Sequence, residues 1–192
     1  MDNYIEKNIA LWDSFLKGDQ QAFSIFYKNN YTMLYSYGRR LQMDDDQIRD
    51  IIHDIFLKLY SNPAIIKATN TIRPFLLVSM RNAFINLQKK TQKQVHTEVL
   101  DFDFKYTVEN DFWDKEKQVD VKREVDNIIR QLTPRQKEII YLRFLYEMSY
   151  EEIAQIMNMS EQAARNLVYR TIDRIRKDNL QAAFVFFLFL AR

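Results

Sequence analysis

The sequence predicts an all-α protein made of two small helical domains joined by an acidic linker. Apolar residues make up 47% of the chain and charged residues 28%, which is the balance of a globular protein. Glycine occurs only twice and proline three times in 192 residues, too rarely for a β-rich fold of this length. On either side of one central segment, apolar residues recur at helical spacing. These three observations favour helices throughout.

Several kinds of site are absent from the sequence. There is no cysteine, which excludes disulfides and thiolate metal sites and fits a reducing, cytoplasmic location. The only histidines are His53 and His96, and His53 forms no catalytic dyad with Asp54 because adjacent residues of a helix point apart. No phosphate-binding glycine loop or nucleophile motif occurs. We therefore expect no enzyme, no cofactor, no metal and no small-molecule substrate.

The first predicted domain spans residues 8–90. Gly18 and Asp19 separate two helices, since glycine commonly ends a helix and aspartate caps the next one. Three acids at 44–46 begin a strongly amphipathic helix, where negative charge suits the helix dipole. Asn62 and Pro63 end that helix, and Pro74 begins another.

Two segments lack this pattern. Across residues 91–118 the periodicity fades and acids outnumber bases, so we predict an acidic linker; the alternatives are a poorly patterned helix or a plain spacer. Residues 181–192 form an apolar tail. Its apolar run, 182–191, would be about 15 Å long as a helix, too short for a bilayer of roughly 30 Å. The tail is expected to pack on the second domain, unless it binds an inhibitory partner or a membrane surface.

The second predicted domain, residues 119–180, contains a pattern typical of a helix-turn-helix. Thr133 and Ser149 each begin a capping box. A tight turn at Asn158 and Met159 joins two short helices, and Ser160 caps the second of them. This helix has an apolar face that we expect to be buried, formed by Ala164, Val168, Ile172 and Ile175.

The other face of the last helix is polar and basic. It carries Gln162, Arg165, Asn166, Tyr169 and Arg170. Arginine can bind guanine with two hydrogen bonds, and asparagine or glutamine can bind adenine in the same way. Although the net charge is only +2, bases outnumber acids beyond Ser160. We predict a DNA-recognition helix; the alternative is an ordinary solvated helix face.

These motifs resemble those of a known family. Residues Leu132–Glu138 and Glu147–Ala154 are similar to the fourth conserved region of bacterial sigma factors. Residues Gly18–Phe23, Asp50–Tyr60 and Ile72–Lys90 are similar to the second region, and the two regions stand in the usual order. The short chain most resembles the extracytoplasmic-function (ECF) group, in particular the iron-citrate-regulator-like members of Bacteroidetes.

The resemblance implies partners and site residues. The partners would be core RNA polymerase, promoter DNA and a membrane-bound anti-sigma factor, with the linker lying in basic polymerase channels. The contacts to polymerase would be Asp50, His53, Asp54, Leu57 and Lys58. The −10 element would be read by Lys67, Asn70, Arg73, Arg81, Asn82 and Asn86. The −35 element would be read by Ser160, Gln162, Arg165, Asn166, Tyr169 and Arg170.

The chain departs from the family pattern at two positions, and two other functions remain open. His53 stands where the family usually has glutamine, and Ala163 where it often has threonine. A stand-alone transcription regulator could carry the same helix-turn-helix, but this leaves residues 19–90 unexplained. An interaction protein or membrane-peripheral protein built around the apolar tail is the third possibility.

Overall fold

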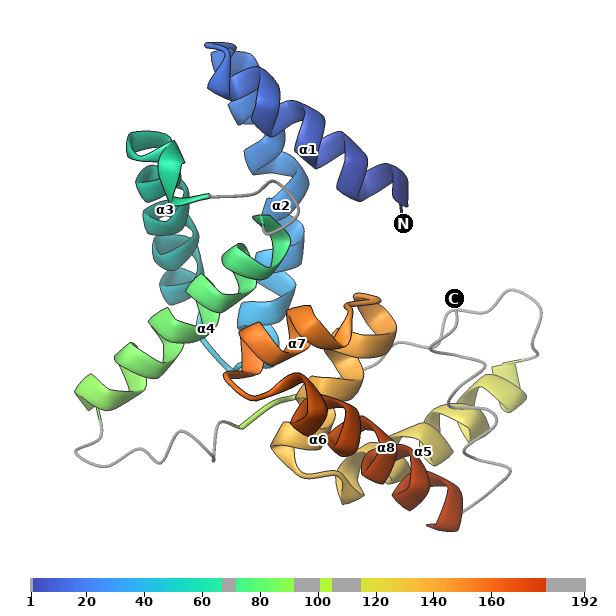
Figure 1. Ribbon diagram of the computed structural model, residues 1–192. Coiled ribbons are helices and arrows are strands. Elements are labelled where there is room, and N and C mark those ends of the chain that lie inside the picture. Colours follow the sequence, from blue (N-terminus) through green and yellow to red (C-terminus); the bar gives the residue numbers. More distant parts are fainter. Residues whose placement is uncertain (1, 67–71, 92–100, 105–114, 179–192) are drawn as a thin grey trace. The chain divides into compact units, whose positions relative to one another are not determined.

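The computed structural model describes residues 2–66, 72–91, 101–104 and 115–178 (Figure 1). Within these ranges every regular element is a helix, which confirms the predicted all-α class. The chain divides into two compact units, Met1–Val95 and His96–Arg192. The predicted tail at 181–192 and most of the predicted linker lie outside the described residues.

The described residues of the first unit form four α-helices and one short 3-10 helix. They are α1 (Asp2–Leu16), α2 (Gln20–Arg40), α3 (Asp45–Ser61), η1 (Pro63–Ile65) and α4 (Ile72–Thr91). The break between α1 and α2 falls where it was predicted. Gly18 has a φ of 102°, a conformation that side chains disfavour. Asp19 then caps α2 by accepting hydrogen bonds from the amides of Gln21 and Ala22, at 2.9 and 3.1 Å.

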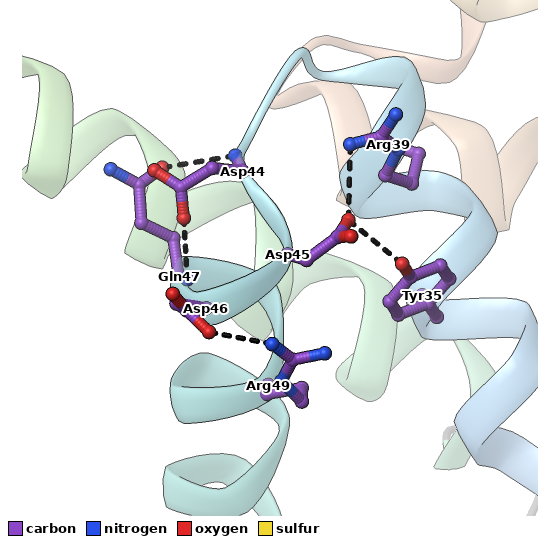
Figure 2. A network of polar contacts seen from close by, with 7 residues as sticks. All are labelled: Tyr35, Arg39, Asp44, Asp45, Asp46, Gln47 and Arg49. Atoms are coloured by element: carbon purple, nitrogen blue, oxygen red, sulfur yellow. Dashed lines mark hydrogen bonds and ion pairs between the residues drawn. The ribbon is translucent and has the colours of Figure 1, made fainter.

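The corner between α2 and α3 is held by the side chains of two neighbouring acids, Asp44 and Asp45 (Figure 2). Asp44 forms a capping box with Gln47: the backbone amide of Gln47 donates to the Asp44 carboxylate at 2.8 Å. Asp45 turns back to α2, where it accepts from the Tyr35 hydroxyl at 2.8 Å and from the Arg39 guanidinium at 3.0 Å. The hydrogen bond to Asp45 raises the pKa of Tyr35, because the hydroxyl must keep its proton to donate. The acids therefore fix the start of α3 as well as suiting its dipole.

Aromatic side chains dominate the core of the first unit. Trp12 of α1 and Phe26 of α2 are almost fully buried, with their ring centroids 5.3 Å apart. Phe56 of α3 lies 5.8 Å from Phe26. A buried polar pair also links α1 to α2, where Asn30 donates to Asn8 at 2.8 Å. Because α3 buries one stripe of residues against this core, its opposite face is left exposed.

The second unit contains α5 (Lys115–Gln131), α6 (Pro134–Ile140), a π-helical turn η3 (Tyr141–Leu145), α7 (Tyr150–Met157) and α8 (Glu161–Asp178). Helix α5 begins at Lys115, within the range 91–118 predicted as linker. Its first four residues are charged or polar, and all are residue types that favour helices. Because none of them is apolar, the sequence shows no helical spacing of apolar residues there.

Part of the predicted linker belongs to the core of the second unit. Phe102 and Phe104 are 0% and 5% exposed. Their rings lie 5.4 and 5.8 Å from the ring of Tyr141, both in edge-on geometry. Asp101, directly before Phe102, is exposed, and Asp103, between the two phenylalanines, is half-buried. Residues 101–104 therefore anchor this stretch to η3 and do not act as a free spacer.

Candidate nucleic-acid interface

The predicted helix-turn-helix is present in the second unit. Ser149 accepts a hydrogen bond from the amide of Glu152 at 3.1 Å, and Glu152 accepts one from the amide of Ser149 at 2.7 Å. Helix α7 ends at Asn158, which adopts the left-handed conformation that asparagine tolerates better than most residues. Ser160 then caps α8 by accepting from the amide of Ala163 at 3.1 Å. Both capping residues and the tight turn are as predicted.

The buried face of α8 differs from the prediction at one position. Ala164, Val168 and Ile175 are buried as expected, but Thr171 is buried and Ile172 is only half-buried. A buried hydroxyl needs a partner, and Thr171 donates to the backbone carbonyl of Leu167 at 2.7 Å. With that hydrogen bond made, a threonine can take a core position on the helix.

The opposite face of α8 is exposed to solvent. All six predicted −35 residues lie on this side or at the cap, namely Ser160, Gln162, Arg165, Asn166, Tyr169 and Arg170. The side-chain amide of Gln162 donates to the oxygen of Asn166 at 3.0 Å, which couples the two amides. Tyr169 is 73% exposed, so both its ring and its hydroxyl are available to a partner. The face combines hydrogen-bonding groups, an aromatic ring and positive charge.

Arg165 makes two contacts within the protein. It forms an ion pair with Glu161, one helical turn earlier on α8. Its guanidinium carbon also lies 4.4 Å from the ring centroid of Tyr150, the first residue of α7. Arg143 of η3 lies over the same ring at 4.8 Å and donates to the carbonyl of Met148 at 2.7 Å. Sequence reasoning missed Tyr150 and Arg143, since only the packing of α7 against α8 and η3 brings them to Arg165.

The predicted −10 residues are only partly brought together. Lys67 and Asn70 lie outside the described residues. Asn82 and Asn86 are exposed on one side of α4, one helical turn apart, and Arg73 is half-buried. Arg81, expected to face the DNA strand, is instead buried with 7% exposed.

The burial of Arg81 corrects the prediction and has a simple geometric reason. Leu77 and Phe84 are buried on α4, and Arg81 lies four residues after the first and three before the second. This spacing places Arg81 on the packed side of the helix. It therefore does not belong to an exposed DNA-binding face.

The predicted polymerase-binding residues form a surface on α3, which we call the α3 outer face. It consists of Asp50, His53, Asp54, Leu57 and Lys58, all of them exposed. Leu57 is 53% exposed, and Tyr60 nearby on the same helix is 45% exposed. The α3 outer face thus combines charged groups with an exposed leucine, and Tyr60 lies nearby.

In the described part of the chain, no three or more histidine, aspartate or glutamate side chains gather as a metal site would require. Among the described helices none combines the length and apolar character needed to cross a bilayer.

Comparison with known proteins gives two family matches. Residues 26–94 match the family model described as Sigma-70 region 2, and residues 122–175 match Sigma-70, region 4. The first match begins within α2 and extends through α4, and the second contains the helix-turn-helix.

Relatives are similar over most of the chain. The ECF RNA polymerase sigma factor SigM of Bacillus subtilis (strain 168) is 22% identical, covering 81% of this chain and 91% of the relative. The ECF RNA polymerase sigma factor SigX of the same organism is 22% identical, and the similarity covers 82% of this chain and 84% of SigX. The solved structure of CnrH in complex with the cytosolic domain of CnrY has a TM-score of 0.55 at 15% identity. It covers 89% of this chain and 96% of CnrH, which shows a shared fold.

The two sigma-70 regions together cover more than half of the chain and occur in the order that the motifs predicted. Each coincides with helices of one structural unit, and the helix-turn-helix lies inside region 4. Sigma factors as a family are not enzymes. The chain therefore belongs to the sigma-70 family and is an ECF-type RNA polymerase sigma factor.

Proposed function

We propose that this sigma factor binds core RNA polymerase through the α3 outer face and reads promoters with α4 and α8. The observation that carries the proposal is the pairing of a region 2 unit with a region 4 unit whose helix α8 exposes hydrogen-bonding and basic side chains. A stand-alone regulator would need only the second of these units. The two units give one chain two separate sequence-reading surfaces.

Helix α8 is proposed to enter the major groove of the −35 element. Arg165, Gln162 and Asn166 suit base edges, because their side chains present paired donors or a donor beside an acceptor. Ser160, Tyr169 and Arg170 suit the sugar-phosphate backbone, where hydroxyl groups and positive charge fix the register of the helix. Further bases follow toward the end of α8, at Arg174, Arg176 and Lys177, and strengthen attraction to phosphate.

Helix α4 is proposed to bind the separated strand of the −10 element. Asn82 and Asn86 supply amides on its exposed side. Lys67, Asn70 and Arg73 precede them in the sequence and are proposed to contact the same strand. A base held outside the helical stack can be read on its pairing edge, which also favours strand separation.

The α3 outer face is proposed to dock on the largest polymerase subunit. Leu57 would be buried in the contact, and the charged residues around it, Asp50, Asp54 and Lys58, would form the polar rim. The resemblance to sigma factors implies a glutamine at the position of His53, so His53 is proposed to replace an amide hydrogen bond with one from an imidazole nitrogen.

Three further features are proposed from the resemblance. The chain acts in the cytoplasm, belongs to the iron-citrate-regulator-like ECF members of Bacteroidetes, and is held inactive by a membrane-bound anti-sigma factor. The last point draws on CnrH, whose structure was solved with the cytosolic domain of CnrY. The acidic residues of 91–118 that lie outside the described core are proposed to enter basic channels of the polymerase.

Replacing Arg165 with alanine tests the recognition helix. If Arg165 reads a base, the change costs about 1–3 kcal/mol of promoter binding and relaxes base preference at one −35 position. The measurement is binding of polymerase carrying the variant to a promoter library with each −35 base varied. Arg176→Ala, near the end of the same helix, is the matched control and should weaken all promoters alike. A uniform loss for Arg165→Ala would show that it binds only phosphate.

A further inference from the structure

We infer that Tyr150 is a positioning residue for promoter recognition, whose ring holds the Arg165 guanidinium in place on α8 before DNA binds. The inference rests on the proposed DNA-binding function and adds a residue from outside the recognition helix. Tyr150 lies at the start of α7, directly after the capping Ser149. Its backbone is therefore fixed by the capping box, and its half-buried ring is carried on a rigid element.

The contact between ring and guanidinium has favourable geometry. The guanidinium carbon of Arg165 is 4.4 Å from the ring centroid, well inside the range of a cation–π interaction. An exposed arginine otherwise samples many rotamers, and DNA binding would have to order it. A side chain that is already ordered loses less entropy when it meets a base. The ring can thus improve both affinity and discrimination without touching DNA.

Arg143 supports the ring from a second element. Its guanidinium carbon is 4.8 Å from the same centroid, and its Nη1 donates to the carbonyl of Met148 at 2.7 Å. The hydrogen bond ties Arg143 to the backbone just before α7. Each guanidinium near the ring also has its own acceptor, a carbonyl for Arg143 and the Glu161 carboxylate for Arg165. These acceptors offset the repulsion between two like charges beside one ring.

DNA binding would affect the two contacts of Arg165, with Glu161 and with Tyr150, in different ways. Its ion pair with Glu161 is about half exposed, so it is screened by salt and readily exchanged for a phosphate or a base. The contact with the Tyr150 ring is a cation–π interaction with the ring face, so DNA need not displace it. A guanidinium over a ring keeps its N–H groups available for hydrogen bonds in its own plane. Tyr150 can therefore hold Arg165 both before and after binding.

Two substitutions separate the ring from the rest of the side chain. Tyr150→Phe keeps the ring and removes only the hydroxyl, whereas Tyr150→Leu keeps apolar volume and removes the ring. The first readout is NMR relaxation of the Arg165 Nε–H group in the full chain without DNA, assigned by its loss in Arg165→Ala. We expect Arg165 to become more mobile in Tyr150→Leu and to stay as ordered as in the wild type in Tyr150→Phe.

The second readout is base preference in the complete polymerase complex. Tyr150→Leu should lower the preference at the single −35 position that Arg165 reads by about two- to fivefold, and Tyr150→Phe should not. In the Arg165→Ala background, Tyr150→Leu should cause no further change at that position. A ring that merely stabilised α7 would weaken all promoters equally and would leave the two substitutions additive.

The outcomes separate this inference from the function on which it rests. Unchanged Arg165 mobility in Tyr150→Leu overturns the inference even if Arg165→Ala alters promoter preference. Equal weakening at all positions overturns it as well. If the mobility responds as expected but Arg165→Ala leaves every preference intact, the role in recognition is overturned and the fault lies in the function proposed for Arg165.

Discussion

Replacing Phe102 with alanine is expected to destabilise the second unit by about 3–5 kcal/mol, the usual cost of removing a fully buried aromatic ring. Phe102 is 0% exposed and lies against Tyr141 together with Phe104. The truncated side chain would leave a cavity beside Tyr141 of η3, the element that precedes the helix-turn-helix in the chain. A segment that served only as a spacer would tolerate this change with an effect within about 0.5 kcal/mol.

Native-state hydrogen exchange can measure this loss unit by unit. Amides of α6 and α8 should lose protection in Phe102→Ala, and amides of α2, in the other unit, should keep theirs. Phe102→Leu, which retains most of the apolar volume, should cost much less. Unchanged protection of α6 in Phe102→Ala would contradict the assignment of residues 101–104 to the core.

Replacing Leu57 with aspartate is expected to weaken binding to core polymerase by about 3 kcal/mol, roughly two orders of magnitude in Kd. Leu57 is 53% exposed in the isolated protein, so the substitution costs the fold little. In the proposed complex the residue would be buried, and the new carboxylate would lose its water without gaining a partner. The measurement is titration of labelled full-length protein with core polymerase.

A matched control is available on α2. Ile25 is 44% exposed, close to the value for Leu57. Phe23 and Tyr27 of α2 contact Phe56 of α3, and Ile25 lies two residues from each, which turns it away from α3. Ile25→Asp should therefore leave polymerase affinity unchanged. Equal losses for both variants, or no loss for Leu57→Asp, would contradict docking through the α3 outer face.

Local signals in the sequence were sufficient for much of the fold. Capping residues mark where helices begin, because the hydrogen bonds they make involve only neighbouring amides, as at Thr133 and Ser149. The exposed face of α8 also followed from spacing alone, since one side of a helix must pack on the domain. These features depend on residues close together in the chain.

Features that depend on distant partners could not be predicted in this way. Phe102 and Phe104 alternate with aspartates, and nothing nearby reveals that Tyr141 covers them. Arg81 looks like a DNA contact until the packing of α4 shows that it is buried. The contact of Tyr150 with Arg165 likewise exists only once α7 packs on α8. Charge and hydrogen-bonding capacity in a sequence do not reveal which side chains the tertiary fold buries.

The most direct test of the central claim is run-off transcription with core polymerase from a related bacterium, on a genomic promoter library, with and without this protein. The sigma-factor account predicts transcripts that depend on the protein and share two upstream elements, near −35 and −10. The Leu57→Asp variant should lose these transcripts, and Arg165→Ala should change which promoters yield them. No transcripts, together with tight binding of the protein alone to duplex DNA, would contradict the account and favour a stand-alone regulator.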